Sequence, residues 1–202
     1  MSDHVPARLV VLASGNGSNL QAILDACRGG GLRAEVVAVV SDQPGALALD
    51  RARQTGVAAH PLPRREGEAR QDYDARLAEL VDQAAPDWVV LAGWMRILTM
   101  AFLGRFPARV VNLHPALPGE HPGVRAIERA YDAWSAGGPA RTGVMVHLVP
   151  DEGVDDGPVL ATAEVPIHAG DTIAELTARV HAAEHQLLVA TLRTLTTPTH
   201  RF

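Results

Sequence analysis

The sequence predicts an α/β fold: a doubly wound, mostly parallel sheet with an antiparallel C-terminal hairpin and a long terminal helix. Two observations carry this prediction. Over the first two thirds of the chain, short β-branched runs alternate with helical periodicity, which is typical of βα units around a parallel sheet. After the Gly-Gly-Pro break at residues 137–139, two longer strand-like runs flank an acidic loop, which is typical of a hairpin.

The elements follow in order along the chain. Buried strands of the parallel part are predicted at residues 9–13, 35–40, 57–60, 88–91 and 109–113. Apolar residues at helical spacing predict connecting helices at residues 19–27, 46–54, 72–84 and 124–134. The hairpin strands are predicted at residues 142–149 and 159–166, paired against the sheet edge. A terminal helix is expected over residues 172–195, with Asp171 as its N-cap.

Composition limits the classes of function. A chain of 202 residues without repeats or a linker is expected to form one domain, residues 1–202. A formal net charge of -5 provides no basic surface for nucleic acid, so the expected partners are small molecules. No apolar run approaches the roughly 20 residues that span a bilayer. The single cysteine, Cys27, and the lack of a signal sequence favour the cytoplasm. A monomer and a homodimer both fit the sequence.

The first candidate site is an Asn-Leu-His-Pro segment that follows the strand-like run at residues 109–113. Asn112 and His114 alternate on an extended chain, so their side chains are expected on one face. Pro115 ends the strand and places the pair at its carboxyl end, where open α/β sheets keep their sites. With Asp155 from the later Asp-Asp-Gly-Pro turn, they could bind an oxyanion and move a proton. A strand end with a structural His and a turn-forming Asn is the alternative.

The second candidate is the loop Ser-Gly-Asn-Gly-Ser-Asn at residues 14–19, between the first strand and the first helix. Small residues at a helix N-terminus expose backbone N–H groups, which favours phosphate binding. The dinucleotide fingerprint would need a glycine at Leu20, and no Gly-Lys-Ser/Thr ending is present, which disfavours NAD and ATP. A tight turn with a helix cap is the alternative.

The third candidate is the segment Gly-Trp-Met-Arg-Ile-Leu at residues 93–98, directly after the fourth strand. It could offer an apolar wall and backbone polar groups to a flat heteroaromatic ligand. Core packing of Trp94, Met95 and Ile97 is the alternative.

In this order, the segments resemble those of the phosphoribosylglycinamide formyltransferases, folate-dependent enzymes of purine synthesis. The resemblance covers essentially the whole chain. It is carried by residues 14–23, 85–98, 112–115, 122–123, 146–147, 155–158 and 184–185. Asn-x-His with a distal Asp is similar to all transferases and hydrolases that use 10-formyltetrahydrofolate. The Gly-Asn-Gly-Ser-Asn loop is similar to that of the glycinamide ribonucleotide branch.

The resemblance implies transfer of a formyl group from 10-formyltetrahydrofolate to the primary amine of glycinamide ribonucleotide, without a metal. The implied catalytic residues are Asn112, His114 and Asp155. The implied ligands of glycinamide ribonucleotide are Gly17, Ser18, Asn19 and Glu184. The implied folate contacts are Arg70, Met95, Arg96, Ile97, Leu98 and Asn112. Residues 1–108 would then be a phosphate-binding half, and residues 109–202 a catalytic and folate-contacting half.

The chemistry implies a role for each catalytic side chain. Attack of the amine on the formyl carbon places negative charge on the formyl oxygen, where Asn112 and a protonated His114 would act as donors. A nearby carboxylate raises the pKa of an imidazole, so Asp155 is expected to keep His114 charged.

Three departures from the family pattern stand near this site. Ala116 replaces the usual Ser after the His-Pro pair, and the next proline is displaced by one position. Asp156 adds a carboxylate beside Asp155, and Met145 occupies a position that is often small and polar. None of them changes the implied catalytic residues, so activity is expected to survive.

Other functions remain to be weighed. His181, Glu184 and His185 match the His-x-x-Glu-His pattern of zinc peptidases, but no Asp or Glu follows Glu184 as a further ligand. Hydrolysis of formyl-folate, or formylation of another amine, would use the same scaffold. A non-catalytic nucleotide-binding module would leave the Asn, His and Asp unexplained. No motif assigns a chemical role to four other histidines, His60, His121, His147 and His168.

Overall fold

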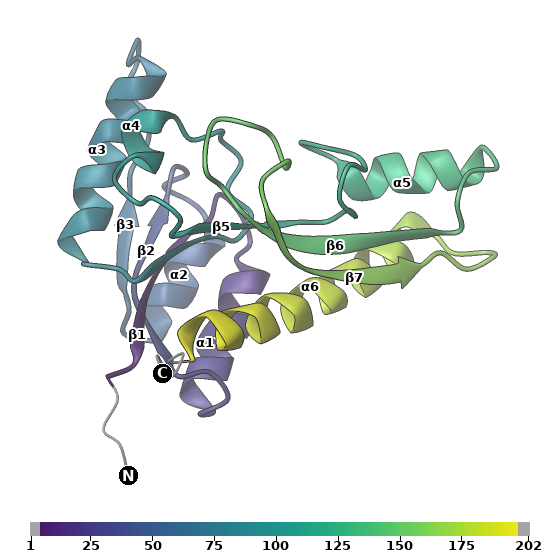
Figure 1. The fold of residues 1–202 in the computed structure, drawn as a ribbon, viewed down its shortest axis with the longest axis horizontal. Helices are drawn as coiled ribbons and strands as arrows, with labels where there is room; N and C mark the ends of the chain where they lie inside the picture. The colour runs from purple at the N-terminus through teal and green to yellow at the C-terminus, as the bar shows by residue number, and fades with distance from the viewer. Residues whose placement is uncertain (1–4, 198–202) are drawn as a thin grey trace.

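A computed structural model describes residues 5–197, which form a seven-stranded sheet of order β3-β2-β1-β4-β5-β6-β7 (Figure 1). Its strands are β1 (Ala7–Leu12), β2 (Ala34–Ser41), β3 (Ala58–Pro61), β4 (Trp88–Leu91), β5 (Val110–His114), β6 (Arg141–Leu148) and β7 (Val159–Pro166). Strands β1 to β5 pair in parallel, whereas β6 is antiparallel to both β5 and β7. The predicted fold class is therefore confirmed.

Helices cover both faces of the sheet. They are α1 (Ser18–Arg28), α2 (Leu47–Gln54), α3 (Arg70–Gln83), α4 (Met100–Leu103), α5 (Ala126–Ser135) and α6 (Ile173–Thr196). One core joins α1, α2 and α6 to the sheet, and a second core joins α3 and α4 to the opposite face. A third, smaller core lies between α5, α6 and the hairpin of β6 and β7. Within residues 5–197, no helix is both long and apolar enough to cross a bilayer.

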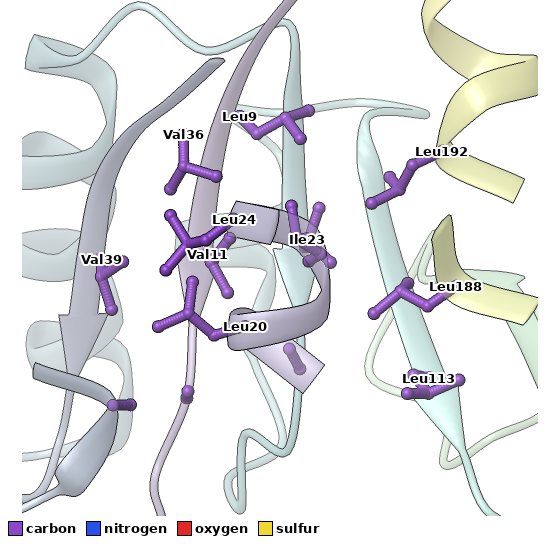
Figure 2. Close-up of a cluster of buried hydrophobic side chains, with 14 of the residues drawn as sticks. Leu9, Val11, Leu20, Ile23, Leu24, Val36, Val39, Leu113, Leu188 and Leu192 are labelled. Carbon is purple, nitrogen blue, oxygen red and sulfur yellow. The ribbon is translucent and has the colours of Figure 1, made fainter. Parts of the chain in front are cut away.

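Apolar spacing explains why α1 lies where it does. Leu20, Ile23 and Leu24 recur three and four residues apart, so they share one helix face and are buried. Figure 2 shows these side chains against Leu9 and Val11 of β1, with α6 beside them. This packing holds the N-terminus of α1 at the carboxyl end of β1.

The first strand marks the topological switch point of the sheet. It pairs with β2 on one side and with β4 on the other. Consecutive connections therefore leave in opposite directions from β1 and β4, and loops 13–17 and 92–99 border the resulting crevice. In open α/β sheets this crevice is where ligands bind.

The terminal helix begins one residue later than the sequence predicts. Its N-cap is Thr172, not Asp171, because Thr172 and Glu175 form a reciprocal capping box. Asp171 instead binds Arg179 at 2.7 Å and 2.9 Å, and accepts the backbone N–H of His168. The prediction of Asp171 as the cap was therefore wrong, because a Thr-x-x-Glu pair competes directly for the same helix end.

Other helix ends also differ from the prediction. Helix α5 starts at Ala126 rather than residue 124, because Arg125 has a left-handed backbone with φ of 58°. Helix α4 was not predicted, since four residues carry too little periodicity. The predicted single domain includes residues 1–4 and 198–202, which lie outside the described residues.

Candidate active site

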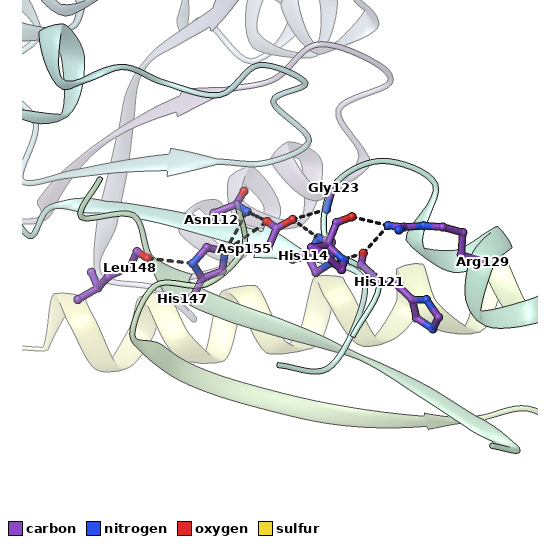
Figure 3. A network of polar contacts seen from close by, with 9 residues as sticks. Asn112, His114, His121, Gly123, Arg129, His147, Leu148 and Asp155 are labelled. Carbon is purple, nitrogen blue, oxygen red and sulfur yellow. Dashed lines mark hydrogen bonds and ion pairs between the residues drawn. The ribbon is translucent and has the colours of Figure 1, made fainter. Parts of the chain in front are cut away.

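The three predicted catalytic side chains meet at the carboxyl end of β5 (Figure 3). The amide Nδ2 of Asn112 donates to Oδ1 of Asp155 at 3.0 Å. Nδ1 of His114 lies 3.2 Å from Oδ2 of the same carboxylate. Alternation along β5 places Asn112 and His114 on one side, and the loop after β6 brings Asp155 across to both.

Asp155 is held by its own backbone and by a neighbouring loop. Its φ of 55° is in the left-handed region, which is sparsely populated by residues other than glycine and is often found at functional sites. Oδ2 also accepts the backbone N–H of Gly123 at 2.7 Å. Burial alone would raise the pKa of Asp155, but contacts from His147, Gly123 and His114 outweigh it and lower that pKa. The carboxylate is therefore ionised at neutral pH.

His114 is only 4% exposed, and both ring nitrogens face oxygen acceptors. Nδ1 faces Asp155, and Nε2 lies 3.1 Å from the backbone carbonyl oxygen of His121. Burial lowers the pKa of His114 below its ordinary value, although Asp155 and the carbonyl raise it. The expectation that Asp155 keeps the free imidazole charged is corrected: desolvation is the larger effect. The Asp155 carboxylate and the His121 carbonyl would accept the two N–H groups of a protonated ring.

Sequence reasoning missed His147 as a member of this cluster. The register of β5 and β6 pairs it directly with Asn112, and its Nε2 lies 3.1 Å from Nδ2 of Asn112. Nδ1 lies 2.9 Å from the carbonyl oxygen of Leu148, which can only accept, so Nδ1 carries a proton. In this tautomer Nε2 accepts a hydrogen bond from Nδ2 of Asn112. Only the strand register, which no local motif reveals, could have indicated this contact.

A cavity of about 220 Å³ opens beside the cluster. It is lined by residues 91, 93–98, 112–115, 123–126, 147, 149, 151 and 153–155. Met95 is 65% exposed and Val124 is 68% exposed, so the lip of the cavity presents apolar side chains to solvent. Trp94 and Leu98 are buried in the core beneath. The alternative of core packing therefore holds for Trp94, whereas Met95 and Ile97 are exposed and line the cavity.

The two arginines predicted to contact folate have protein partners. The guanidinium of Arg96 binds the buried carboxylate of Asp42 at 2.8 Å and lies 5.4 Å from the ring centroid of Tyr73. Arg70 does not line the cavity, and it forms an exposed ion pair with Glu152 at 2.9 Å. Glu152 belongs to the loop that carries Asp155, so Arg70 ties α3 to that loop.

The phosphate-loop candidate lies beside this cavity. Ser14 accepts the backbone N–H of Met95 at 2.9 Å and donates its own N–H to Gly93. Gly17 is the N-cap of α1 with φ of 75°, and it has no side chain to cap the helix. Arg51, which sequence reasoning missed, holds the carbonyl and side-chain oxygens of Asn16 at 2.8 Å and 3.0 Å.

The loop also meets the terminal helix. Glu184 of α6 is 5% exposed and forms a hydrogen bond with Asn19. Burial raises the pKa of Glu184 to about 7, against the opposing effect of that hydrogen bond. The four residues predicted to bind glycinamide ribonucleotide, Gly17, Ser18, Asn19 and Glu184, are therefore close together, although they come from opposite ends of the chain.

The zinc-peptidase pattern on α6 is arranged differently from a metal site. Nε2 of His181 lies 3.9 Å from Glu184, and Nε2 of His185 is buried without a hydrogen-bond partner. Across the described part of the chain, no group of three or more His, Cys, Asp or Glu side chains is arranged to hold a metal.

The departures from the family pattern fit local packing. Ala116 is fully buried, and the following turn is closed by a hydrogen bond from Glu120 N to Leu117 O. A Cβ atom on Gly143 would lie 2.4 Å from the Leu117 side chain, so the altered loop packs onto this glycine. Met145 is buried opposite His114, whereas Asp156 is exposed.

Comparisons with known proteins agree with this site. Residues 7–192 match the formyl transferase family. The phosphoribosylglycinamide formyltransferase of Escherichia coli (strain K12) is 45% identical over 179 residues, 89% of this chain and 82% of that protein. The enzyme of the same name from Schizosaccharomyces pombe is 42% identical, over 95% of this chain and 98% of its own length. The crystal structure of glycinamide ribonucleotide transformylase 1 from Symbiobacterium toebii has a TM-score of 0.90 and 39% identity, over 96% of this chain and 89% of that one. The chain therefore belongs to the formyl transferase family, within the branch of the phosphoribosylglycinamide formyltransferases.

Proposed function

We propose that this protein transfers the formyl group of 10-formyltetrahydrofolate to the primary amine of glycinamide ribonucleotide. The observation that carries the proposal is the contact of Asp155 with both Asn112 and His114 at the wall of the cavity. A folate-derived formyl donor is a co-substrate here, and the faces of its rings suit a cavity bordered by the apolar side chains of Met95, Ile97 and Val124.

In this proposal His114 first acts as a base. Burial lowers the pKa of its imidazole, so the ring can keep one proton on Nδ1 toward Asp155 and leave Nε2 unprotonated. When the amine displaces the His121 carbonyl from Nε2, that nitrogen can take the proton that the amine loses while attacking the formyl carbon. The resulting imidazolium faces Asp155 and the His121 carbonyl, which stabilise its charge. The new C–N bond forms, the bond from the formyl carbon to folate N10 breaks, and N10 receives the proton held by His114, either directly or relayed by an ordered water.

Asn112 and charged His114 then donate hydrogen bonds to the oxygen of the tetrahedral intermediate. The Asn112 amide already donates to Asp155 and faces His147, so it is held in place before substrate binds. A donor held in this way has little reorganisation left to undergo when charge develops. To reach the formyl oxygen, one amide hydrogen exchanges a protein acceptor for the substrate.

Glycinamide ribonucleotide would bind across the two ends of the chain. The uncapped N-terminus of α1, with Gly17, Ser18 and Asn19, suits its phosphate, and Glu184 suits its ribose or glycinamide part. The halves at residues 1–108 and 109–202 would supply the phosphate loop and the catalytic cluster. Both contribute to the cavity, since residues 91–98 precede the boundary.

The test follows the absorbance of a 10-formyl folate in the presence and absence of glycinamide ribonucleotide, with His114→Ala beside the wild type. Turnover that requires the ribonucleotide and is lost in the variant supports the transferase. Turnover without the ribonucleotide would mean a hydrolase. No turnover in either case would favour a binding module. His60→Ala, which changes an imidazole on edge strand β3, is the matched control.

A further inference from the structure

The His114 and Asp155 side chains are both held by one tripeptide, residues 121–123. The carbonyl oxygen of His121 lies 3.1 Å from Nε2 of His114, and the N–H of Gly123 donates to Asp155 at 2.7 Å. The position of this short piece of backbone therefore sets the geometry of the catalytic pair at two points.

The backbone conformation of residues 121–123 depends on contacts from outside this tripeptide. His121 and Gly123 both have positive φ, 46° and 78° respectively. A left-handed backbone is unfavourable at a residue with a Cβ atom, so an external contact helps His121 to keep this shape. The preceding loop contains the displaced proline, Pro118, and has no regular secondary structure.

Arg129 of α5 supplies that contact. Its Nη2 donates to the carbonyl oxygens of both His121 and Pro122, at 2.6 Å and 2.5 Å (Figure 3). The side chain is half-buried, one turn along α5 from the loop, and its Nε is buried without a partner. The guanidinium is thus directed at the loop backbone.

We propose that Arg129 is a positioning residue for the transfer reaction: by binding the carbonyls of residues 121 and 122, it holds the His121 carbonyl against His114 and the Gly123 N–H against Asp155. Arg129 does not line the cavity, so it acts through the loop and not on substrate. This inference rests on the proposed function only for its kinetic consequence. The structural part concerns the free protein.

The kinetic test compares Arg129→Met, which keeps an apolar stem without donors, with Arg129→Lys, which keeps a charged donor. We expect kcat to fall roughly 10-fold to 10²-fold in Arg129→Met, with KM for both substrates nearly unchanged, because misplacement of a catalytic group affects the reaction more than binding. Arg129→Lys should restore most of kcat. The control is Arg53→Met, which removes an exposed ion pair with Asp50 at 2.8 Å on α2, away from this loop.

A second readout does not need turnover. The ¹⁵N resonance of His114 Nε2 reports whether the His121 carbonyl still contacts the ring. We expect this resonance to move in Arg129→Met, and to stay near its wild-type position in Arg129→Lys and Arg53→Met. Wild-type kcat together with an unmoved resonance in Arg129→Met would overturn the proposal. Absence of formyl transfer in the wild type would instead count against the proposed function, and the resonance would still test Arg129.

Discussion

Oδ2 of Asp155 lies 3.2 Å from Nδ1 of His114, yet the pKa of this histidine lies below its ordinary value because its burial outweighs the carboxylate. The same carboxylate oxygen accepts the N–H of Gly123. Asp155 therefore orients the imidazole and stabilises the charge that it acquires during the reaction, rather than charging it beforehand.

The first prediction concerns the titration of His114. We expect its midpoint in the unliganded protein to lie below 6.5, because burial disfavours the imidazolium. The unfolded chain binds this proton more readily, so the stability due to neutral His114 is complete above about pH 6.5 and is lost as pH falls through the folded pKa. NMR of the His114 ring across pH measures the midpoint. A value above 6.5 would mean that Asp155 is the larger effect.

Two adjacent carboxylates allow a matched comparison. Asp155→Asn should lower kcat by at least about 10²-fold, because the amide orients His114 poorly and cannot balance its charge. Asp156→Asn changes the exposed neighbour and should leave kcat within about 2-fold, as expected for a side chain outside the cluster. Steady-state kinetics of both variants decide the matter. Equal losses would indicate that the charge of the loop matters and not the contact with His114.

Glu184 should make stability depend on pH. Its pKa of about 7 in the folded protein lies above the ordinary 4.5, so the unfolded chain releases the proton first. The corresponding stability, roughly 3 kcal/mol, is present below about pH 4.5 and is lost as pH rises to about 7. Glu184→Gln should therefore be more stable than the wild type near pH 8, and this gain in stability should be much smaller near pH 5. The variant should also bind glycinamide ribonucleotide more weakly. Thermal unfolding at both pH values tests this; an equal effect at both would exclude the titration of Glu184 as its cause.

Replacement by alanine should have sharply different costs in stability at two glycines of the phosphate loop. A Cβ atom at Gly17 would lie 2.8 Å from the Cα of Ala48, and φ there is 75°. Gly17→Ala should cost roughly 2–4 kcal/mol and raise KM for glycinamide ribonucleotide, because the loop must move away from α2. At Gly15 nothing lies within 4 Å, so Gly15→Ala should cost less than about 1 kcal/mol. Urea unfolding compares them, and similar costs would contradict the close approach of the loop to α2.

Local patterns predict the fold and much of the site. Alternation along residues 109–113 places Asn112 and His114 on one face, and Pro115 ends the strand after them. Small residues at 14–19 indicate the loop that starts α1. These features depend on neighbours in the chain, which the sequence displays directly. The predicted Asp171 cap shows the limit of such reasoning, since two adjacent residues could both serve and only one has the matching Glu175.

Contacts across the sheet were decided only by the tertiary structure. The register of β5 and β6 pairs His147 with Asn112, and packing of α5 brings Arg129 onto residues 121 and 122. The contact between the loops that follow β2 and β4 brings Arg96 to Asp42. The sequence by itself determined which residue types stand at each strand end, because periodicity is local. The burial of His114, its hydrogen-bond partners and its pKa depend on segments that are far apart in the chain. They were therefore decided only when those segments packed together.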